Sequence, residues 1–100
     1  MTSFAVTVSF RLQHGQRDAF LPLMYDNALQ SRSLEPGCLR FDVLTPEPDD
    51  DHTVFLYEVY TTRANFDAHL AADHYRSFDV ATRSMVAAKT VGFFVLTDAP

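Results

Sequence analysis

The chain has 100 residues, a formal net charge of −5 and a single cysteine. This length predicts one domain over residues 1–100, and an acidic chain without a basic run disfavours a nucleic-acid partner. No apolar stretch is long enough to cross a membrane, and the N-terminus lacks the pattern of a secretory signal. The lone Cys38 cannot form an internal disulfide. This fits a reducing compartment, so we expect a cytoplasmic protein.

The first third of the chain predicts a strand followed by a helix. Residues Phe4 to Phe10 alternate between apolar and small, mildly polar side chains, which is typical of a strand with one apolar face. After a break at His14 and Gly15, apolar residues recur at helical spacing over about Arg17 to Ser33. Pro22 removes one backbone donor, so we place it near the first turns. The predicted inward stripe consists of Phe20, Leu23, Met24 and Ala28.

The middle of the chain predicts a turn and two strands. Pro36 cannot continue the helix, and Gly37 supplies the permissive backbone that the reversal needs. We expect a strand over Cys38 to Leu44, a hairpin loop over Thr45 to His52, and a strand over Thr53 to Tyr60. The loop contains three consecutive aspartates and a histidine, which we interpret as a solvated loop rather than a metal site, because nothing fixes a ligand cage. One face of the second strand is expected to carry Leu39, Phe41 and Val43.

The last third predicts two helical segments and a final strand. Thr61 or Thr62 can cap a helix that carries Phe66, His69 and Leu70. Asp73 is expected to cap the next segment, and Val91 to Thr97 forms the last strand. The order is therefore β-α-β-β-α-β with the second helical region broken in two. This predicts an α+β fold of the ferredoxin-like type, an antiparallel sheet with helices on one face.

The open face of this sheet needs a cover. An antiparallel sheet covered on one side usually shows polar residues on the other, but Thr53 to Tyr60 and Val91 to Leu96 are apolar on both faces. A second copy of the chain would bury the same patch twice. We therefore expect a homodimer through the open sheet face.

Asn27 is the first candidate for a site residue. It follows the apolar stripe of the first helix and lies two turns beyond Phe20, and Ser31 extends the line by one further turn. A buried amide without a hydrogen bond costs about 1–3 kcal/mol. Two interpretations remain open: Asn27 bonds a nearby carbonyl and fixes the helix, or it donates to a substrate oxygen.

His69 and His74 are the candidates for a proton-accepting group. His69 lies on one helix face with Phe66, and packing without chemistry is the alternative for it. On one continuous helix the two histidines would diverge, and they do not form the i,i+4 pair that binds zinc. A helix break near Ala71 to Asp73 would let them converge. A neutral imidazole is a suitable general base for a phenol-type hydroxyl.

Glu58 is expected on a covered face of the third strand, where its carboxylate needs a partner. We interpret it as a member of a structural ion pair, with Arg40 as the partner, or as a dimer contact, in preference to a catalytic role, which stays open as the alternative. For Tyr57 and Tyr60, the alternative to a role in the site is the packing role that is usual for tyrosines in strands. Cys38 has no adjacent base and is read as structural.

Several of these segments, in this order, resemble the antibiotic biosynthesis monooxygenase (ABM) family. They are Ser33 to Val43, Tyr57 to Tyr60, His69, and the triplet Asp73-His74-Tyr75, and the resemblance extends from about Phe4 to Leu96. The family includes quinol monooxygenases and an isomerase that degrades a phosphorylated autoinducer-2 signal. The resemblance implies a dimeric alpha-beta barrel whose pocket includes the positions of His69, His74 and Tyr75. It also raises the substrate-binding interpretation of Asn27.

Two features of the sequence discriminate among the branches of this family. The isomerase branch typically has a histidine directly after the helix asparagine, where this chain has Ala28. This difference weakens the isomerase interpretation without removing it. The haem-degrading branch uses a tryptophan, and this chain has none, so haem breakdown ranks low among the expected activities.

The expected catalytic residues are His69, His74 and Asn27. The expected pocket residues are Phe20, Met24, Ser31, Phe41, Tyr57, Phe66 and Tyr75.

The function that we expect is cofactor-independent monooxygenation of a quinol, an anthrone or a similar polyphenol, with dioxygen as co-substrate. No GxGxxG, P-loop or metal-ligand spacing is present, so we expect no cofactor and no metal. Two alternatives remain: isomerisation or binding of a small polar metabolite of the autoinducer-2 degradation type, and a non-catalytic dimeric binding or stress protein. A phosphate-bearing substrate should need several basic residues, and only Arg40, Arg76 and Lys89 are plausible.

Overall fold

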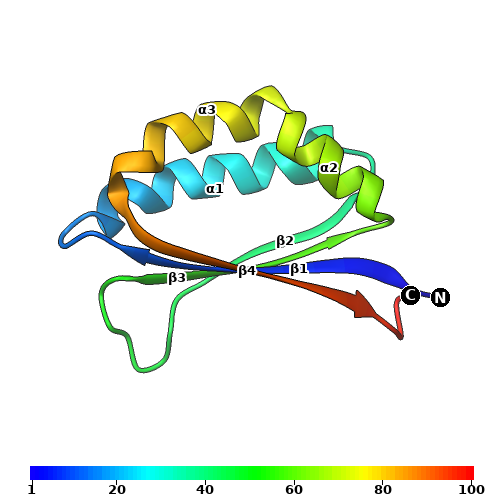
Figure 1. Cartoon of the computed structure of the whole chain (residues 1–100), viewed down its shortest axis with the longest axis horizontal. Helices are drawn as coiled ribbons and strands as arrows, with labels where there is room; N and C mark the ends of the chain where they lie inside the picture. Colours follow the sequence, from blue (N-terminus) through cyan, green and yellow to red (C-terminus); the bar gives the residue numbers. More distant parts are fainter.

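The computed structural model describes residues 1–100 as a four-stranded antiparallel sheet with all helices on one face (Figure 1). The expected ferredoxin-like arrangement is confirmed, including the division of the second helical region. The elements are β1 (Ser3–Leu12), α1 (Arg17–Leu34), β2 (Cys38–Leu44), β3 (Thr53–Tyr60), α2 (Arg63–Ala71), α3 (Asp73–Thr82), a 3₁₀ turn η1 (Arg83–Met85) and β4 (Val86–Leu96).

The strand order β2-β3-β1-β4 places β3 and β1 in the middle of the sheet and leaves β2 and β4 as edges. Strand β3 pairs with β1 so that Val6 lies opposite Glu58, and β2 pairs with β3 so that Phe41 also lies opposite Glu58. The register of β2 shifts between Cys38 and Arg40. This irregularity turns Leu39 outward, where it is exposed. Its expected place on the face of Phe41 and Val43 is therefore wrong, because the expectation assumed an unbroken alternation.

Helix α1 covers the sheet through one stripe of side chains. The buried residues are Phe20, Met24, Asn27, Ala28 and Ser31. Leu23 was expected in this stripe but is exposed on the rim. Phe20 packs against Phe10 of β1 and Phe78 of α3, with ring centroids 5.2 and 5.7 Å apart. The first and third helices are therefore joined through one aromatic core.

The turn after α1 depends on Gly37 for a reason other than the one expected. Its backbone has no positive φ; a Cβ at this position would lie 2.2 Å from the Asn65 side chain. The Gly37 carbonyl also accepts a hydrogen bond from the backbone N–H of Thr61. Glycine is therefore needed because the start of α2 approaches the turn closely.

The break between α2 and α3 occurs at Ala72, which has an extended backbone with φ −73° and ψ 145°. Thr62 caps the start of α2 by accepting from the Asn65 N–H. Asp73 is the first residue of α3 rather than its cap, which is Ala72. The break turns the chain so that His69 and His74 can approach each other, as the sequence predicted.

Strand β4 begins at Val86, five residues before the expected start at Val91. It pairs with the whole length of β1, from Ser3 to Leu12. The helices do not bury β4, because Val91, Phe93, Phe94 and Val95 all stay exposed. Figure 1 shows β4 running along the outside of the sheet below the helical layer. No helix is long and apolar enough to span a membrane.

Candidate active site

A cavity of about 240 Å³ lies between the helical layer and the sheet. Its walls come from all four strands and all three helices, and most of them are aromatic or aliphatic. The exposed members, Leu70, Lys89, Val91 and Phe93, come from α2 and β4, so the cavity opens between these two elements. The apolar lining consists of Val8, Phe10, Met24, Phe41, Leu56, Phe66, Leu70, Tyr75, Phe78, Val91 and Phe93.

Four polar side chains interrupt this apolar lining. They are Asn27 from α1, Glu58 from β3, His69 from α2 and Lys89 from β4. The first three are nearly fully buried, whereas Lys89 is exposed at the mouth. An apolar cavity with a few convergent polar groups is the usual form of a small-molecule site.

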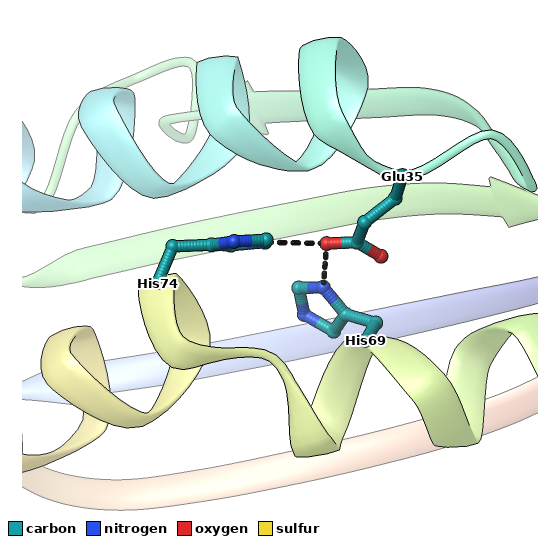
Figure 2. A group of neighbouring side chains, drawn as sticks. All are labelled: Glu35, His69 and His74. Carbon is teal, nitrogen blue, oxygen red and sulfur yellow. Dashed lines mark hydrogen bonds and ion pairs between the residues drawn. The ribbon is translucent and has the colours of Figure 1, made fainter.

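His69 and His74 meet at a carboxylate that the sequence did not reveal. Glu35 caps the C-terminal end of α1. Its Oε2 lies 2.8 Å from His69 Nδ1 and 2.5 Å from His74 Nε2. Figure 2 shows the three side chains converging from the end of α1, from α2 and from the start of α3. The helix break at Ala72 therefore brings the two imidazoles to one oxygen atom.

This arrangement assigns the tautomer of His69. Glu35 is an acceptor when ionised, so the N–H of His69 lies on Nδ1 and donates to Oε2. The Nε2 atom is then left with a free lone pair. Burial lowers the pKa of His69 below its ordinary value, while hydrogen bonding to Glu35 opposes that shift. His69 is consequently neutral at neutral pH, and its free nitrogen can accept a proton.

The same three residues are of the types that bind divalent metals, and their ligand atoms all lie within 4.8 Å of one another. Two of the atom pairs are at hydrogen-bonding distances of 2.8 and 2.5 Å. Ligand atoms around a tetrahedral zinc with bonds of about 2.0–2.1 Å would stand roughly 3.3 Å apart. Glu35, His69 and His74 therefore have the geometry of a hydrogen-bonded proton network.

Asn27 has a buried oxygen without a partner. Its Oδ1 accepts no hydrogen bond within the protein, while its backbone carbonyl accepts from the Ser31 hydroxyl at 2.7 Å. Ser31 Oγ lies 3.4 Å from His69 Nδ1. A buried acceptor left unpaired costs about 1–3 kcal/mol. Asn27 is also one of the residues that line the cavity.

Glu58 has a different partner from the one expected. The Tyr60 hydroxyl donates to Glu58 Oε1 at 2.6 Å. Arg40 is on the opposite face of the sheet, where it pairs with Asp42. The ion pair with Arg40 is therefore wrong, because adjacent strand pairing places the two side chains on different faces. Burial raises the pKa of Glu58 to about 7.

Of the ten expected site residues, six line the cavity: Asn27, His69, Met24, Phe41, Phe66 and Tyr75. His74 lies behind His69, in contact with Glu35. Ser31 is also behind the wall, and Phe20 is in the core below it. Tyr57 points to the open face of the sheet, because it alternates with Leu56 and Glu58, which face the helices. Tyr57, Phe20 and Ser31 are therefore not wall residues.

Three residues of the site were missed or misread at the sequence level. Glu35 looks like an ordinary residue before Pro36, and only the fold shows that it reaches two histidines more than thirty positions away. Lys89 is recognisable from the sequence only as a cation, because the strand predicted from the apolar pattern begins after it, at Val91. Glu58 carried a usable signal, since it alternates with apolar residues on a strand that should face the core.

Comparison with known proteins agrees with this architecture. The sequence profile described as "Antibiotic biosynthesis monooxygenase" matches residues 3–80. The chain belongs to the antibiotic biosynthesis monooxygenase (ABM) family. The resemblance first seen in short motifs is therefore confirmed at the level of the family, and the quinol-oxidising or isomerase branch is not decided by it. No curated protein sequence matches the chain.

Solved structures extend the likeness to nearly the whole fold. A candidate antibiotic biosynthesis monooxygenase from Nitrosomonas europaea is 26% identical, covers 98% of this chain and 94% of its own, and superposes with a TM-score of 0.91. A candidate member from Chloroflexus aurantiacus is 23% identical with a TM-score of 0.84, and a protein from Mycobacterium tuberculosis is 23% identical with a TM-score of 0.80. Both of these cover 98% of this chain and 96% of their own. At this identity they show the shared fold alone.

Proposed function

We propose that this ABM-family protein oxygenates a quinol, an anthrone or a similar phenolic compound with dioxygen and without a bound cofactor. The observation that carries the proposal is His69, a buried neutral imidazole whose free Nε2 belongs to an otherwise largely aromatic cavity. A phenolic hydroxyl is the kind of group that such a base can deprotonate near neutral pH. The resulting phenolate is electron-rich enough to react with dioxygen itself.

The substrate class follows from the size and lining of the cavity. A volume of about 240 Å³ lies below the roughly 300–1,000 Å³ that is usual for ligand sites. Within the proposed class, this favours a compact quinol of one or two rings over a three-ring anthrone. Phe41, Phe66 and Tyr75 line the cavity around His69, and their ring centroids lie 5.0 to 6.3 Å from the imidazole. A flat aromatic substrate would find stacking partners there.

The proton leaves the substrate through the histidine and carboxylate pair. His69 Nε2 takes the phenolic proton, and the imidazolium that forms keeps its Nδ1–H donated to Glu35. The carboxylate stabilises this positive charge, as the acidic member of a catalytic triad does. The Lys89 ammonium at the mouth can offset the negative charge of the phenolate. Asn27 Oδ1 can accept from a second substrate hydroxyl.

The alternative of a phosphorylated metabolite receives less support. A phosphate carries about two negative charges and is usually held by several donors from arginine, lysine or backbone groups. Within the cavity lining, Lys89 is the one basic residue apart from His69, and Arg40 lies on the other face of the sheet. We therefore favour an uncharged phenolic substrate over an isomerase substrate of the autoinducer-2 type.

The experiment that tests the proposal is dioxygen uptake. A panel of one-ring and two-ring quinols and an anthrone is added to the purified protein in an oxygen electrode, with product analysis by mass spectrometry under ¹⁸O₂. Incorporation of one labelled oxygen atom, faster than in buffer and abolished in His69→Ala, supports monooxygenation. Uptake equal to the autoxidation rate across the panel contradicts it.

A further inference from the structure

Glu58 is the one carboxyl group in the cavity lining, and it sits in apolar surroundings. Its side chain is 2% exposed, and its cross-strand neighbours on both sides are apolar, Val6 on β1 and Phe41 on β2. A carboxylate buried among such neighbours without a cation in contact is costly. No salt bridge is formed by Glu58, whose single protein hydrogen-bond partner is the hydroxyl of Tyr60.

Tyr60 determines which oxygen of Glu58 remains available. The tyrosine is fully buried, and its hydroxyl donates to Oε1 at 2.6 Å. Burial and the neighbouring carboxyl raise the pKa of Tyr60 far above its ordinary value, so it stays a donor. In the neutral acid the carbonyl oxygen is therefore Oε1, and the proton lies on Oε2. Because Glu58 lines the cavity and Oε2 has no protein partner, that proton is available to a ligand.

The same tyrosine links Glu58 to the histidine. The ring centroids of Tyr60 and His69 are 5.7 Å apart, so Glu58 and His69 flank one side chain and face one cavity. His69 lacks a proton on its free Nε2, and neutral Glu58 carries a proton on its free Oε2. Pairs of titratable groups held in opposite protonation states typically divide the acid and base roles of a site.

We propose that Glu58 is a second catalytic residue of this site, which as a neutral acid donates a hydrogen bond from Oε2 to a ligand oxygen. In turnover it transfers that proton to the peroxide oxygen formed when dioxygen adds to the substrate. Tyr60 is the positioning residue. This inference rests on the proposed function for its chemical step, but its ligand-binding part does not depend on turnover.

Dioxygen oxidises the deprotonated substrate and forms a carbon–oxygen bond, which gives a peroxide anion on a carbon that carries one hydrogen. Glu58 Oε2 gives its proton to the terminal oxygen and becomes a carboxylate. The Glu58 carboxylate then removes the hydrogen from the carbon as a proton, the electron pair of the C–H bond forms the C=O bond, and the O–O bond breaks. The departing hydroxide takes up the proton that His69 accepted from the substrate and leaves as water, so both residues return to their starting states. The neutral Oε2–H is the group needed at the first of these proton transfers.

The charges around Glu58 set the pH range of this role. Burial is the largest cause of its raised pKa of about 7, and Tyr60 and Lys89 oppose the shift while Glu35 adds to it. Glu58 is therefore mostly neutral at pH 6 and mostly ionised above about pH 8. The ionisable groups on the elements packed around it are Glu35 at the C-terminal cap of α1, Cys38 on β2, Tyr60 on β3, His69 on α2, Tyr75 on α3 and Lys89 on β4.

Binding of 2-hydroxy-1,4-naphthoquinone under anaerobic conditions tests the proposal without turnover. This probe is an anion throughout the range from about pH 6 to 8.5, so only the protein titrates. Neutral Glu58 donates to the anionic oxygen, whereas ionised Glu58 repels it. The wild type should bind about tenfold or more weakly at pH 8.5 than at pH 6, since affinity follows the fraction in the competent state. Glu58→Gln keeps a donor but cannot ionise, so its affinity should stay constant within about twofold.

Two further variants separate positioning from general electrostatics. Tyr60→Phe removes a hydrogen bond that lowers the pKa of Glu58, so the pH at which binding weakens should move upward. Glu47→Gln changes an exposed loop carboxylate and should behave as the wild type. Circular dichroism and thermal unfolding confirm that each variant is folded.

Each outcome supports or overturns a named part of the proposal. Equal pH dependence in the wild type and Glu58→Gln overturns it, and so does failure of the wild type to bind the probe at pH 6. If binding behaves as expected but no quinol drives oxygen uptake, the proposed function fails and the role of Glu58 in ligand recognition stands. If uptake occurs and Glu58→Gln has an unchanged kcat, the proton-transfer role fails alone. The expected result is a kcat lowered roughly 10²-fold or more with little change in KM.

Discussion

Glu35 Oε2 lies 2.8 Å from His69 Nδ1, although the two residues are 34 positions apart in the chain. The same oxygen lies 2.5 Å from His74 Nε2. One carboxylate at the end of α1 therefore fixes the rotamers and tautomers of two imidazoles on two different helices. The exposed fractions of the three side chains are at most 13%, so water does little to weaken this network.

Replacing Glu35 with glutamine should lower the pKa of His69 further. The hydrogen bond and charge of Glu35 both raise that pKa, and an amide keeps one hydrogen bond at most and loses the charge. Turnover should fall by about tenfold or more, because a hydrogen bond to a charged group contributes roughly 1.5–3 kcal/mol. A histidine titration followed by NMR checks the pKa. An unchanged His69 titration would mean that Glu35 has no electrostatic effect there, and Glu47→Gln is the matched control.

The two histidines should have unequal effects on catalysis. His69 lines the cavity, and His74 touches it only through Glu35. His69→Ala should lower kcat by on the order of 10²–10⁴, as expected for a lost general base, and His74→Ala should lower it by a smaller factor. His52→Ala, in an exposed loop, controls for the loss of a histidine as such. Steady-state kinetics in which His74→Ala is the more damaging variant would reverse the assignment.

Asn27 should be more important for function than for stability. Its unpaired Oδ1 costs the folded protein about 1–3 kcal/mol, so the near-isosteric Asn27→Leu should leave the free energy of unfolding unchanged or slightly raised. The same variant should weaken turnover, because the substrate loses one hydrogen bond. Urea denaturation and oxygen uptake measure the two effects. A destabilised variant with full activity would show that the amide serves the fold.

The strand and helix boundaries followed largely from local patterns in the sequence. The bounds of β2 and β3 agree with the expected ones, because alternating apolar residues lie between clear breakers. The start of β4 did not follow, because Ala87, Ala88, Lys89 and Thr90 show no apolar alternation. They form a strand because β1 offers a continuous hydrogen-bonding edge to them. Such pairing is a property of the sheet and not of the segment.

The candidate site was predictable to the extent that it depends on helix faces. Asn27 and His69 continue apolar stripes, and a break near Asp73 was enough to bring His74 back toward them. The role of Glu35 depends on where the end of α1 lies relative to α2 and α3, which no local pattern encodes. Tyr57 illustrates a different error. It is next to Glu58 on the same strand, so the alternation of side chains already places the two residues on different faces of the sheet. This alternation excludes Tyr57 from the cavity that Glu58 lines.

Glu58 should make stability depend on pH in a defined direction. Its folded pKa of about 7 lies above the ordinary value of 4.5, so the folded state binds more protons than the unfolded state between these values. The free energy of unfolding therefore falls as pH rises from about 4.5 through 7, and the destabilisation by the ionised Glu58 is complete above that range. Glu58→Gln removes this cost and should be more stable than the wild type at pH 8 by roughly 1–3 kcal/mol. Urea unfolding at pH 5 and pH 8 measures it; a difference that does not grow with pH would contradict the raised pKa.

The exposed edge of the sheet leads to a prediction about assembly. Phe93, Phe94 and Val95 of β4 are all about half exposed or more, and Phe94 lies on the open face, in register with Ala5 of β1. Contiguous apolar area of this kind in a small protein usually marks an interface. We expect a homodimer, which would need to bury on the order of 800 Å² per chain.

Light scattering at low micromolar concentration should give about twice the chain mass of 11.3 kDa. Phe94→Glu should shift the protein to a monomer, because dimerisation would then bury an unpaired carboxylate on each side of the interface. Val80→Glu is the matched control: Val80 is also exposed and apolar, but it lies on α3, in the helical layer and not on the open sheet face. A wild type of single-chain mass would overturn the dimer. A dimer that persists in Phe94→Glu but is lost in Val80→Glu would instead move the interface from the open sheet to the helices.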